Sequence, residues 1–393
     1  MFCSNFLMSI GPAILLLSAF IGVGPIKTFQ NFARNPVLLS ISLVFLLYLL
    51  SGVQSSNNEY WLERLRVKIP FLVVPLAIAG LPALSKNTLQ RILAFFLGIA
   101  TISAIIVASL YLMRYDYYTS NYITGTVMPT PLNHIRYSLI LAFAVATGCW
   151  LLYSKWNKDK KWVQVLISLA ALFILAFLHV LAVRSGLLAV YLVLLYWFVF
   201  LLFSGRKLTF TLSIALLVGA GLWAAFSFVP TLKNKVAYAK YDMEHFLKGE
   251  VNTDFSDAKR LASIHTGWAV GRKYPVTGVG IGDIKESMEF EYRKHYPDLV
   301  DNDPLPHNQF VLIFASMGLI GLLVFFWSIG APLLLPGAMR DPLLITFLLV
   351  SIPSLLTETT FETQLGVTFY ITFLCLILHQ KMSGVLSSKI KPK

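Results

Sequence analysis

The chain has 393 residues, of which 57% are hydrophobic and only 13% are charged, and its mean hydropathy is +0.71. Soluble domains carry roughly a quarter charged residues, so this composition excludes a soluble protein and predicts an all-α polytopic membrane protein. The net charge of +13 lies mostly between apolar runs rather than in a soluble basic domain, which argues against nucleic-acid binding. Three scattered cysteines, Cys3, Cys149 and Cys375, predict neither a disulfide framework nor a metal site.

Apolar runs of about 20 residues recur along the chain and predict about eleven transmembrane helices, within a range of about 10–12. The N-terminus lacks a basic region and an obvious cleavage site, so we expect the first run to remain as a membrane segment. The runs are 8–24, 36–53, 67–84, 91–113, 134–153, 162–181, 185–203, 208–229, 307–330, 343–357 and 365–380.

We divide the chain into four parts on this basis. N-terminal transmembrane helices occupy 1–133, central ones 134–229, a polar loop domain 230–306 and C-terminal transmembrane helices 307–393. The loop domain holds eleven Lys and Arg against twelve Asp and Glu, and it lies between the eighth and ninth predicted spans. No other part of the sequence resembles a soluble domain.

Alternate loops differ in their basic residues, which predicts the orientation in a membrane. One side receives fifteen Lys and Arg: Lys27, Arg34, Lys86, Arg91, Lys155, Lys158, Lys160, Lys161, Arg206, Lys207, Arg340, Lys381, Lys389, Lys391 and Lys393. The short loops of the other side receive six: Arg64, Arg66, Lys68, Arg114, Arg136 and Arg184. The positive-inside rule makes the first side cytoplasmic and places the N-terminus and residues 230–306 outside. The basic cluster at 63–68 disagrees locally and leaves the topology of the first three spans open.

Two amphipathic helices are predicted inside the loop domain, over 235–249 and 258–275, the second ended by Pro275. The glycine-rich stretch 278–283 follows as a turn. It superficially resembles a phosphate-binding loop, but no strand precedes it and no Gly-Lys-Ser/Thr follows, which argues against a nucleotide site.

The stretch 307–321 places a histidine in the first turn of a long apolar helix. Phe314, Gly318 and Gly321 fall within roughly 40° of His307 on a helical wheel, so one stripe carries a titratable group at its end and bare backbone deeper in. Small residues at this spacing favour close approach by another helix. A boundary histidine is consistent with either a polar anchor or a reactive group.

An arginine interrupts the apolar sequence between 162 and 203. This stretch is too long for one span, so the break is expected near Arg184, at the outer membrane face. A cation there either lines a wet cavity that receives an anion or reaches toward lipid phosphates.

Three features together resemble the O-antigen ligase and polymerase superfamily. Arg184 and Leu188 fit its arginine-x-x-x-leucine pattern. His307, Asn308, Gly318 and Gly321 fit its pattern of His-Asn, nine residues and Gly-x-x-Gly. Arg260, fifteen residues before Pro275 and the turn Gly278-Val-Gly280, resembles its external loop helix. The resemblance covers roughly residues 134–380, and the first four spans match only in hydropathy.

This resemblance implies a GT-C-like helical bundle whose external loop covers the site. It also implies transfer of a glycan from an undecaprenyl diphosphate carrier to an acceptor hydroxyl at the periplasmic face, without cofactor, nucleotide sugar or metal. The implied location is the bacterial inner membrane, with membrane lipid as surroundings. Ligation to lipid A core is the default subtype, while repeat-unit polymerisation and transfer to protein share the motifs. The sequence does not determine the sugar, the acceptor or the oligomeric state.

The chemistry of such a transfer explains the residue types. A diphosphate leaving group gains charge as the anomeric bond breaks, and arginine forks bind phosphate oxygens in pairs. Arg184 and Arg260 are therefore expected to hold the diphosphate. His307 is expected either to act as general base on the acceptor hydroxyl or, when protonated, to bind phosphate.

Secondary candidates for substrate binding are His134 and Arg136, which open the span 134–153, together with Asn308 and Arg272. Glu358 and Glu362 read as solvated charges of a short outer loop rather than as a carboxylate pair. A transporter of lipid-linked substrates remains an alternative class, although it would more often show inverted repeats and charges near mid-membrane.

Overall fold

The computed structural model describes residues 5–121, 128–204, 229–247, 256–297 and 304–390, together with residues 219, 223 and 227. Within these residues every regular element is a helix and no strand occurs, which confirms the predicted all-α class. Up to residue 204 the helices are α1 (Asn5–Val23), α2 (Pro25–Ala33), α3 (Pro36–Ser51), η1 (Gly52–Gln54), α4 (Asn58–Lys68), α5 (Pro70–Gly80), α6 (Lys86–Met113), α7 (Tyr115–Asn121), α8 (His134–Tyr153), α9 (Lys161–Leu181) and α10 (Arg184–Phe203). They continue with α12 (Pro230–Leu247), α13 (Ser256–Lys273), α14 (Ile284–His295), α15 (Gln309–Gly330), η4 (Ala331–Leu334), η5 (Ala338–Arg340), α16 (Pro342–Thr357), η6 (Thr360–Glu362) and α17 (Gln364–Ile390).

Seven helical stretches among the described residues are long and apolar enough to cross a membrane, and the bent pair α1–α2 brings the number to eight. The seven are 36–54, 86–113, 134–153, 161–181, 184–203, 309–334 and 364–383, each at a predicted span. The predicted spans 67–84 and 343–357 contain the shorter apolar helices α5 and α16. The predicted span 208–229 lies almost wholly outside the described residues.

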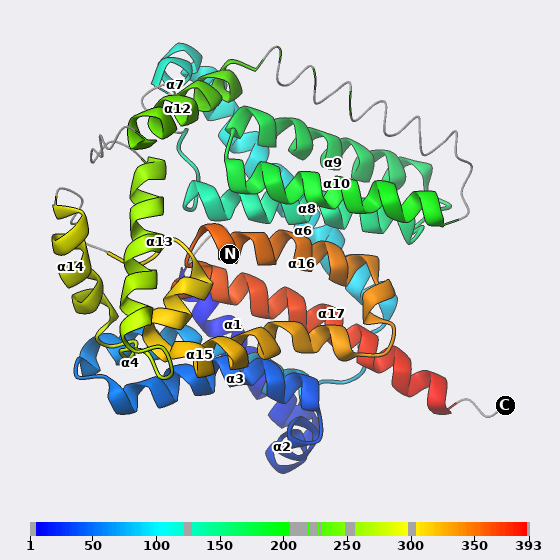
Figure 1. Cartoon of the computed structure of the whole chain (residues 1–393). Coiled ribbons are helices and arrows are strands. Elements are labelled where there is room, and N and C mark those ends of the chain that lie inside the picture. Colours follow the sequence, from blue (N-terminus) through cyan, green and yellow to red (C-terminus); the bar gives the residue numbers. More distant parts are fainter. Residues whose placement is uncertain are drawn as a thin grey trace.

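Helix α16 occupies the middle of the bundle (Figure 1). It packs against α8 and α10 on one side and against α15 and α17 on the other. Helix α13 runs across one end of these helices, with α14 beside it (Figure 1). The loop-domain helices therefore cover the bundle end where α8 and α10 begin and where α16 ends.

A close approach of backbones attaches α13 to α15. A Cβ at Gly267 would lie 2.8 Å from the Val311 side chain, and one at Gly271 would lie 2.4 Å from Phe314. The Trp268 and Phe314 rings pack beside this contact, with centroids 4.8 Å apart. The small-x-x-x-small spacing on α13 thus lets it lie directly on α15, the helix that follows His307.

Gly318, in the stripe of small residues on α15, contacts a turn and not the helix that we expected. Gly318 adopts φ 63° and ψ −165°, which interrupts α15. The carbonyls of Ala315 and Ser316 accept hydrogen bonds from Val279 and Gly280. Beyond the break, the N–H groups of Leu319 and Ile320 donate to the carbonyls of Pro275 and Val276. The turn thus satisfies the backbone groups that the break releases.

The glycine-rich turn is held on its other face by the connection between α3 and α4. Ser51 and Ser55 side-chain oxygens accept from the backbone of Ile281 and Gly282, at 2.8 and 3.0 Å. Asp283 in turn accepts from the N–H groups of residues 56 and 57. The amides of residues 279–282 are therefore all bonded to protein groups, so this turn has no donors left to cradle a phosphate.

Candidate functional site

Glu358, just beyond the C-terminal end of α16, joins the two predicted reactive residues of the outer region. Its Oε1 accepts a hydrogen bond from Arg260 Nη2 at 2.8 Å, and its Oε2 lies 3.2 Å from His307 Nδ1. The Glu358 side chain is 14% exposed, against 33% for Arg260 and 41% for His307. Two cationic or titratable groups that still reach solvent thus share one largely buried carboxylate.

Helix α13 positions Arg260 and His307 relative to each other. Ser263 lies one turn after Arg260 on the same helix face, and its hydroxyl donates to the Arg260 carbonyl. The same oxygen accepts the backbone N–H of His307 at 3.0 Å. His307 lies just before α15 rather than in its first turn, because the helix begins at Gln309. The histidine is consequently held by α13 as well as by the chain entering α15.

The charge state of Glu358 follows from its surroundings. Burial alone would raise its pKa, but the interaction with His307 and the positive charges of Arg260 and Arg136 outweigh it and hold the pKa of Glu358 below the ordinary carboxyl value. An ionised carboxylate only accepts hydrogen bonds. Nδ1 of His307 must therefore carry the proton in this contact, which leaves Nε2 of a neutral ring as the acceptor.

Arg184 lines a cavity next to this cluster. The cavity measures about 290 Å³ and is lined by Ile135, Arg184, Ser185, Leu188, Arg260, Thr357 and Glu358. Arg184 is the first residue of α10, where the unpaired N–H groups of a helix favour an anion. The structure thus brings Arg184 and Arg260 to one cavity, while His307 stands behind Glu358 and does not line it.

Ser185 and Gly186 follow Arg184 in the first turn of α10, and each has its own part in the packing near the cavity. A Cβ at Gly186 would lie 2.4 Å from Ser138, so glycine is needed for α10 to approach α8 this closely. The Ser185 hydroxyl is buried and has no hydrogen-bond partner among the described residues. A buried hydroxyl beside a cavity with two arginines is a further group suited to an oxygen-rich ligand.

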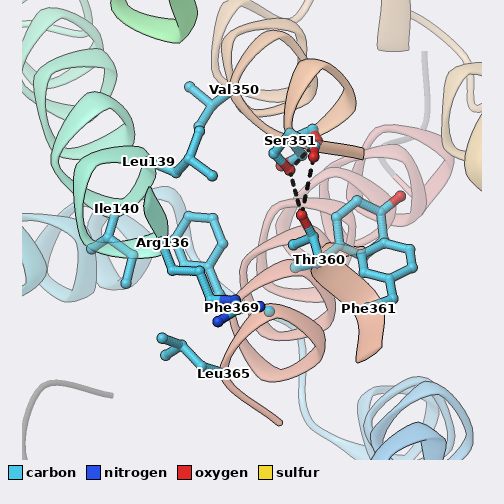
Figure 2. Close-up of a pocket in the computed structure, with 12 residues that line it drawn as sticks. Arg136, Leu139, Ile140, Val350, Ser351, Thr360, Phe361, Leu365 and Phe369 are labelled. Atoms are coloured by element: carbon cyan, nitrogen blue, oxygen red, sulfur yellow. Dashed lines mark hydrogen bonds between the residues drawn. The ribbon is translucent and has the colours of Figure 1, made fainter. Parts of the chain in front are cut away.

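Arg136 lies deeper, among apolar side chains between α8 and α17 (Figure 2). Its Nε is buried and has no hydrogen-bond partner in the described part of the chain. It borders a separate cavity of about 20 Å³ with Leu139, Leu365 and Phe369. Its charge acts on Glu358, so Arg136 reaches the cluster electrostatically rather than by lining the larger cavity.

The other predicted binding residues are placed differently. Asn308 caps α15 by accepting from the backbone of Phe310 and Val311, and its amide donates to the Leu356 carbonyl at 3.0 Å. His134 opens α8, just before the cavity residue Ile135. Arg272 lies twelve residues after Arg260 on α13, roughly 18 Å along the helix, and its guanidinium sits over Trp268. The structure does not bring Arg272 to the cavity.

The interpretation of Glu358 and Glu362 as solvated loop charges is wrong. Glu362 is 3% exposed and accepts from Lys68 Nζ at 3.0 Å, while Lys68 is completely buried. Tyr48 and Gln309 also donate to Glu362. The basic cluster at 63–68, which disagreed with the charge count, thus supplies a partner for a buried acid. Lys68 therefore does not act as a solvated topology signal.

Residues 169–326 match the family model described as O-antigen ligase. The match confirms the resemblance to the O-antigen ligase superfamily. It includes Arg184, Arg260 and His307 and ends before Glu358. It indicates a ligase- or polymerase-like membrane glycosyltransferase. No curated protein matches the chain.

Sequence reasoning missed Glu358 and Ser263 as parts of the candidate site and Gln309 as a partner of Glu362. One signal was available for the first. Two acids occur four residues apart between apolar segments of a chain that is only 13% charged, and such carboxylates are seldom free of partners. No comparable signal marks a serine or a glutamine, because their role depends on which helices meet.

Proposed function

We propose that the chain is an O-antigen ligase-like glycosyltransferase that moves a glycan from undecaprenyl diphosphate to an acceptor hydroxyl at the periplasmic face. Lipid A core is the default acceptor. The observation that carries the proposal is the cavity lined by Arg184, Arg260 and Glu358, with His307 in contact with Glu358. The resemblance over residues 169–326 supports the same chemistry.

In the proposed reaction the acceptor oxygen attacks the anomeric carbon of the donor glycan. The new carbon–oxygen bond forms while the bond from that carbon to the diphosphate oxygen breaks, and the electron pair leaves with the diphosphate. Arg184 and Arg260 bind the phosphate oxygens as their charge grows, which lowers the barrier because fixed donors need no rearrangement. The acceptor proton goes to a base.

His307 is the proposed base. With Nδ1–H donated to Glu358, its Nε2 is left to take the proton, and the carboxylate stabilises the imidazolium that results. Arg260 contacts the same carboxylate before donor binds. Glu358 accepts from Nη2 of the guanidinium, and the other N–H groups of Arg260 serve the diphosphate. The second role predicted for His307, phosphate binding, requires its protonated form.

The test is transfer of radiolabelled glycan from an undecaprenyl diphosphate donor by purified protein in EDTA. Arg184→Ala, Arg260→Ala and His307→Ala are each expected to lower kcat/KM by about 100-fold or more. Arg293→Ala is the matched control, because Arg293 is an exposed arginine of α14 that pairs only with Glu289 among the described contacts. Equal activity of all four variants would contradict the proposal.

The choice of acceptor separates the subtypes. Product formed with lipid A core indicates a ligase, product formed with a second lipid-linked repeat unit indicates a polymerase, and product formed with a protein acceptor indicates an O-oligosaccharyltransferase. Movement of the lipid-linked substrate across vesicles, without any transfer, would instead favour a transporter.

Orientation needs its own experiment. In a background without Cys3, Cys149 and Cys375, Lys294→Cys on α14 should react with a membrane-impermeant thiol reagent in cells whose inner membrane is intact. Labelling only after that membrane is opened would place the loop domain in the cytoplasm and would contradict transfer at the periplasmic face.

A further inference from the structure

The short segment 358–362, between α16 and α17, carries a carboxylate at each end. Glu358 faces Arg260 and His307, as described above. Glu362 points into the bundle, where helices α3, α4 and α15 supply its partners. The position of the first carboxylate is therefore tied to the contacts of the second.

Both carboxylate oxygens of Glu362 and its backbone carbonyl oxygen accept hydrogen bonds from other residues. Lys68 donates to Oε2 at 3.0 Å, and Gln309 Nε2 donates to Oε1 at 3.1 Å. The Tyr48 hydroxyl also donates to Oε1. The Arg64 guanidinium donates to the Glu362 carbonyl at 3.2 Å. This segment is thus anchored through both its side chain and its backbone.

Gln309 connects this anchor to the proposed base. It lies two residues after His307, at the first position of α15. Its Oε1 accepts the Phe361 N–H at 2.9 Å while its Nε2 donates to Glu362. One amide therefore fixes the segment carrying Glu358 to the turn of chain carrying His307. The 3.2 Å contact between Glu358 Oε2 and His307 Nδ1 joins the same two segments.

A gain in stability does not by itself explain the buried ion pair between Lys68 and Glu362. Desolvating two charges costs several kcal/mol per ion, and well-packed apolar residues often replace such pairs without loss. A paired charge with additional hydrogen bonds does, however, accept only one arrangement of its partners.

We propose that Glu362, held by Lys68 and Gln309, is a positioning residue for glycan transfer: it fixes Glu358, and through Glu358 the ring of His307. The inference rests on the proposed function. It also gives the helices before residue 169, which lie outside the family match, a direct part in building the site.

The test compares two double variants that both remove the buried charges. Lys68→Met with Glu362→Leu removes the hydrogen bonds as well, and kcat should fall by about tenfold or more while the donor KM changes by less than about twofold. Lys68→Met with Glu362→Gln keeps an amide for Tyr48 and Gln309 and should recover most of kcat. Thermal unfolding of each variant identifies losses that are only structural.

The pH–rate profile is the second measurement. Glu358 is faced by His307 from α15, by Arg260 from α13 and by Arg136 from α8. If the segment loses its anchor, these contacts loosen and Glu358 stabilises the His307 imidazolium less, so the acidic limb of the profile should move to lower pH. A role confined to folding would leave the limb unchanged in the molecules that remain folded.

Gln309→Met provides an independent variant if the Leu variant does not fold, since it removes the bridge without leaving a buried charge unpaired. It should show the same fall in kcat and the same shift of the acidic limb. Lys273→Met with Glu291→Gln is the control, because this pair joins α13 to α14 and contacts neither His307 nor Glu358. Unchanged kcat and pH profile in folded Leu and Met variants would overturn the proposal.

One further measurement separates failure of this proposal from failure of the proposed function. Carbethoxylation of His307 by diethyl pyrocarbonate, located by mass spectrometry, needs no substrate. If the wild-type protein transfers no glycan, a several-fold change of the His307 rate in the Leu variant still supports positioning. Equal rates in wild type, variant and control contradict it.

Discussion

Glu358 and Glu362 are four residues apart and share one segment, but their surroundings differ. Glu362 is sealed inside the bundle, where protein donors occupy its oxygens. Glu358 borders a cavity of about 290 Å³, and its cationic partner Arg260 is a third exposed. A buried carboxylate whose oxygens all accept hydrogen bonds from the protein, such as Glu362, connects the segments that supply the donors. A carboxylate that lines a cavity, such as Glu358, leaves its cationic partner accessible to a ligand.

Changes in the buried cluster of Glu362, Lys68, Tyr48 and Gln309 should have the largest effect on the stability of the fold. Lys68→Met leaves Glu362 buried without its cation, which should cost about 3–5 kcal/mol of stability. Thermal unfolding in detergent measures this loss, and adding Glu362→Gln should restore most of it. A melting temperature equal to wild type in the single variant would show that Lys68 and Glu362 are not a sealed pair.

The attachment of the loop domain should give the next largest effect. An alanine Cβ at Gly318 would lie 2.2 Å from the Val276 carbonyl oxygen, and the φ of 63° is unfavourable for alanine. Gly318→Ala should therefore cost at least about 1–2 kcal/mol and loosen the α13–α15 contact that carries Arg260. Gly330→Ala on the same helix is the control, because no atom lies within 4 Å of its added Cβ. Equal thermal stability of the two variants would contradict the docking described here.

The cluster of Glu358, Arg260 and His307 should make the stability of the protein depend on pH. The pKa of Glu358 is lower in the folded protein than in the unfolded chain, so its ion pairs contribute fully above the ordinary carboxyl pKa. That contribution is lost as pH falls through the lower, folded value. Arg260→Ala removes one of the charges that depress this pKa. The loss of stability on acidification should then be smaller and should end at higher pH than in wild type, as pH-dependent unfolding would measure. An equal loss over the same pH range would exclude the Arg260–Glu358 pair.

Arg272 should give the smallest effect. It lies on the same helix as Arg260, but it is exposed and packs over Trp268. Arg272→Ala should change stability by less than about 0.5 kcal/mol and leave kcat/KM within about twofold. A large loss of transfer would show that the site extends along α13 beyond the cavity.

The sequence predicted the parts of the fold that depend on local pattern. The apolar runs marked the long helices, and the loop-domain helix ended by Pro275 appears as α13. The order and spacing of Arg184, Arg260 and His307 pointed to residues that the structure places around one carboxylate and one cavity.

What the sequence did not reveal depends on tertiary contacts. The stripe on α15 was expected to meet a helix, but Gly318 instead accommodates a turn, because a break in the helix releases backbone groups that the turn can bind. Glu358 and Glu362 were expected to be solvated, since nothing local shows that Arg260 and Lys68 come from distant segments to meet them. Periodicity describes a helix face, but it does not identify the element that covers it.

The most direct test of the comparison is binding of undecaprenyl diphosphate to purified protein, measured for wild type, Arg260→Ala and the Lys68→Met, Glu362→Gln double variant. Our account predicts that Arg260→Ala weakens binding by about tenfold or more, because a charge-assisted phosphate contact is lost, while the double variant binds like wild type. Weakened binding in the double variant together with unchanged binding in Arg260→Ala would contradict it and would place the ligand at the buried cluster.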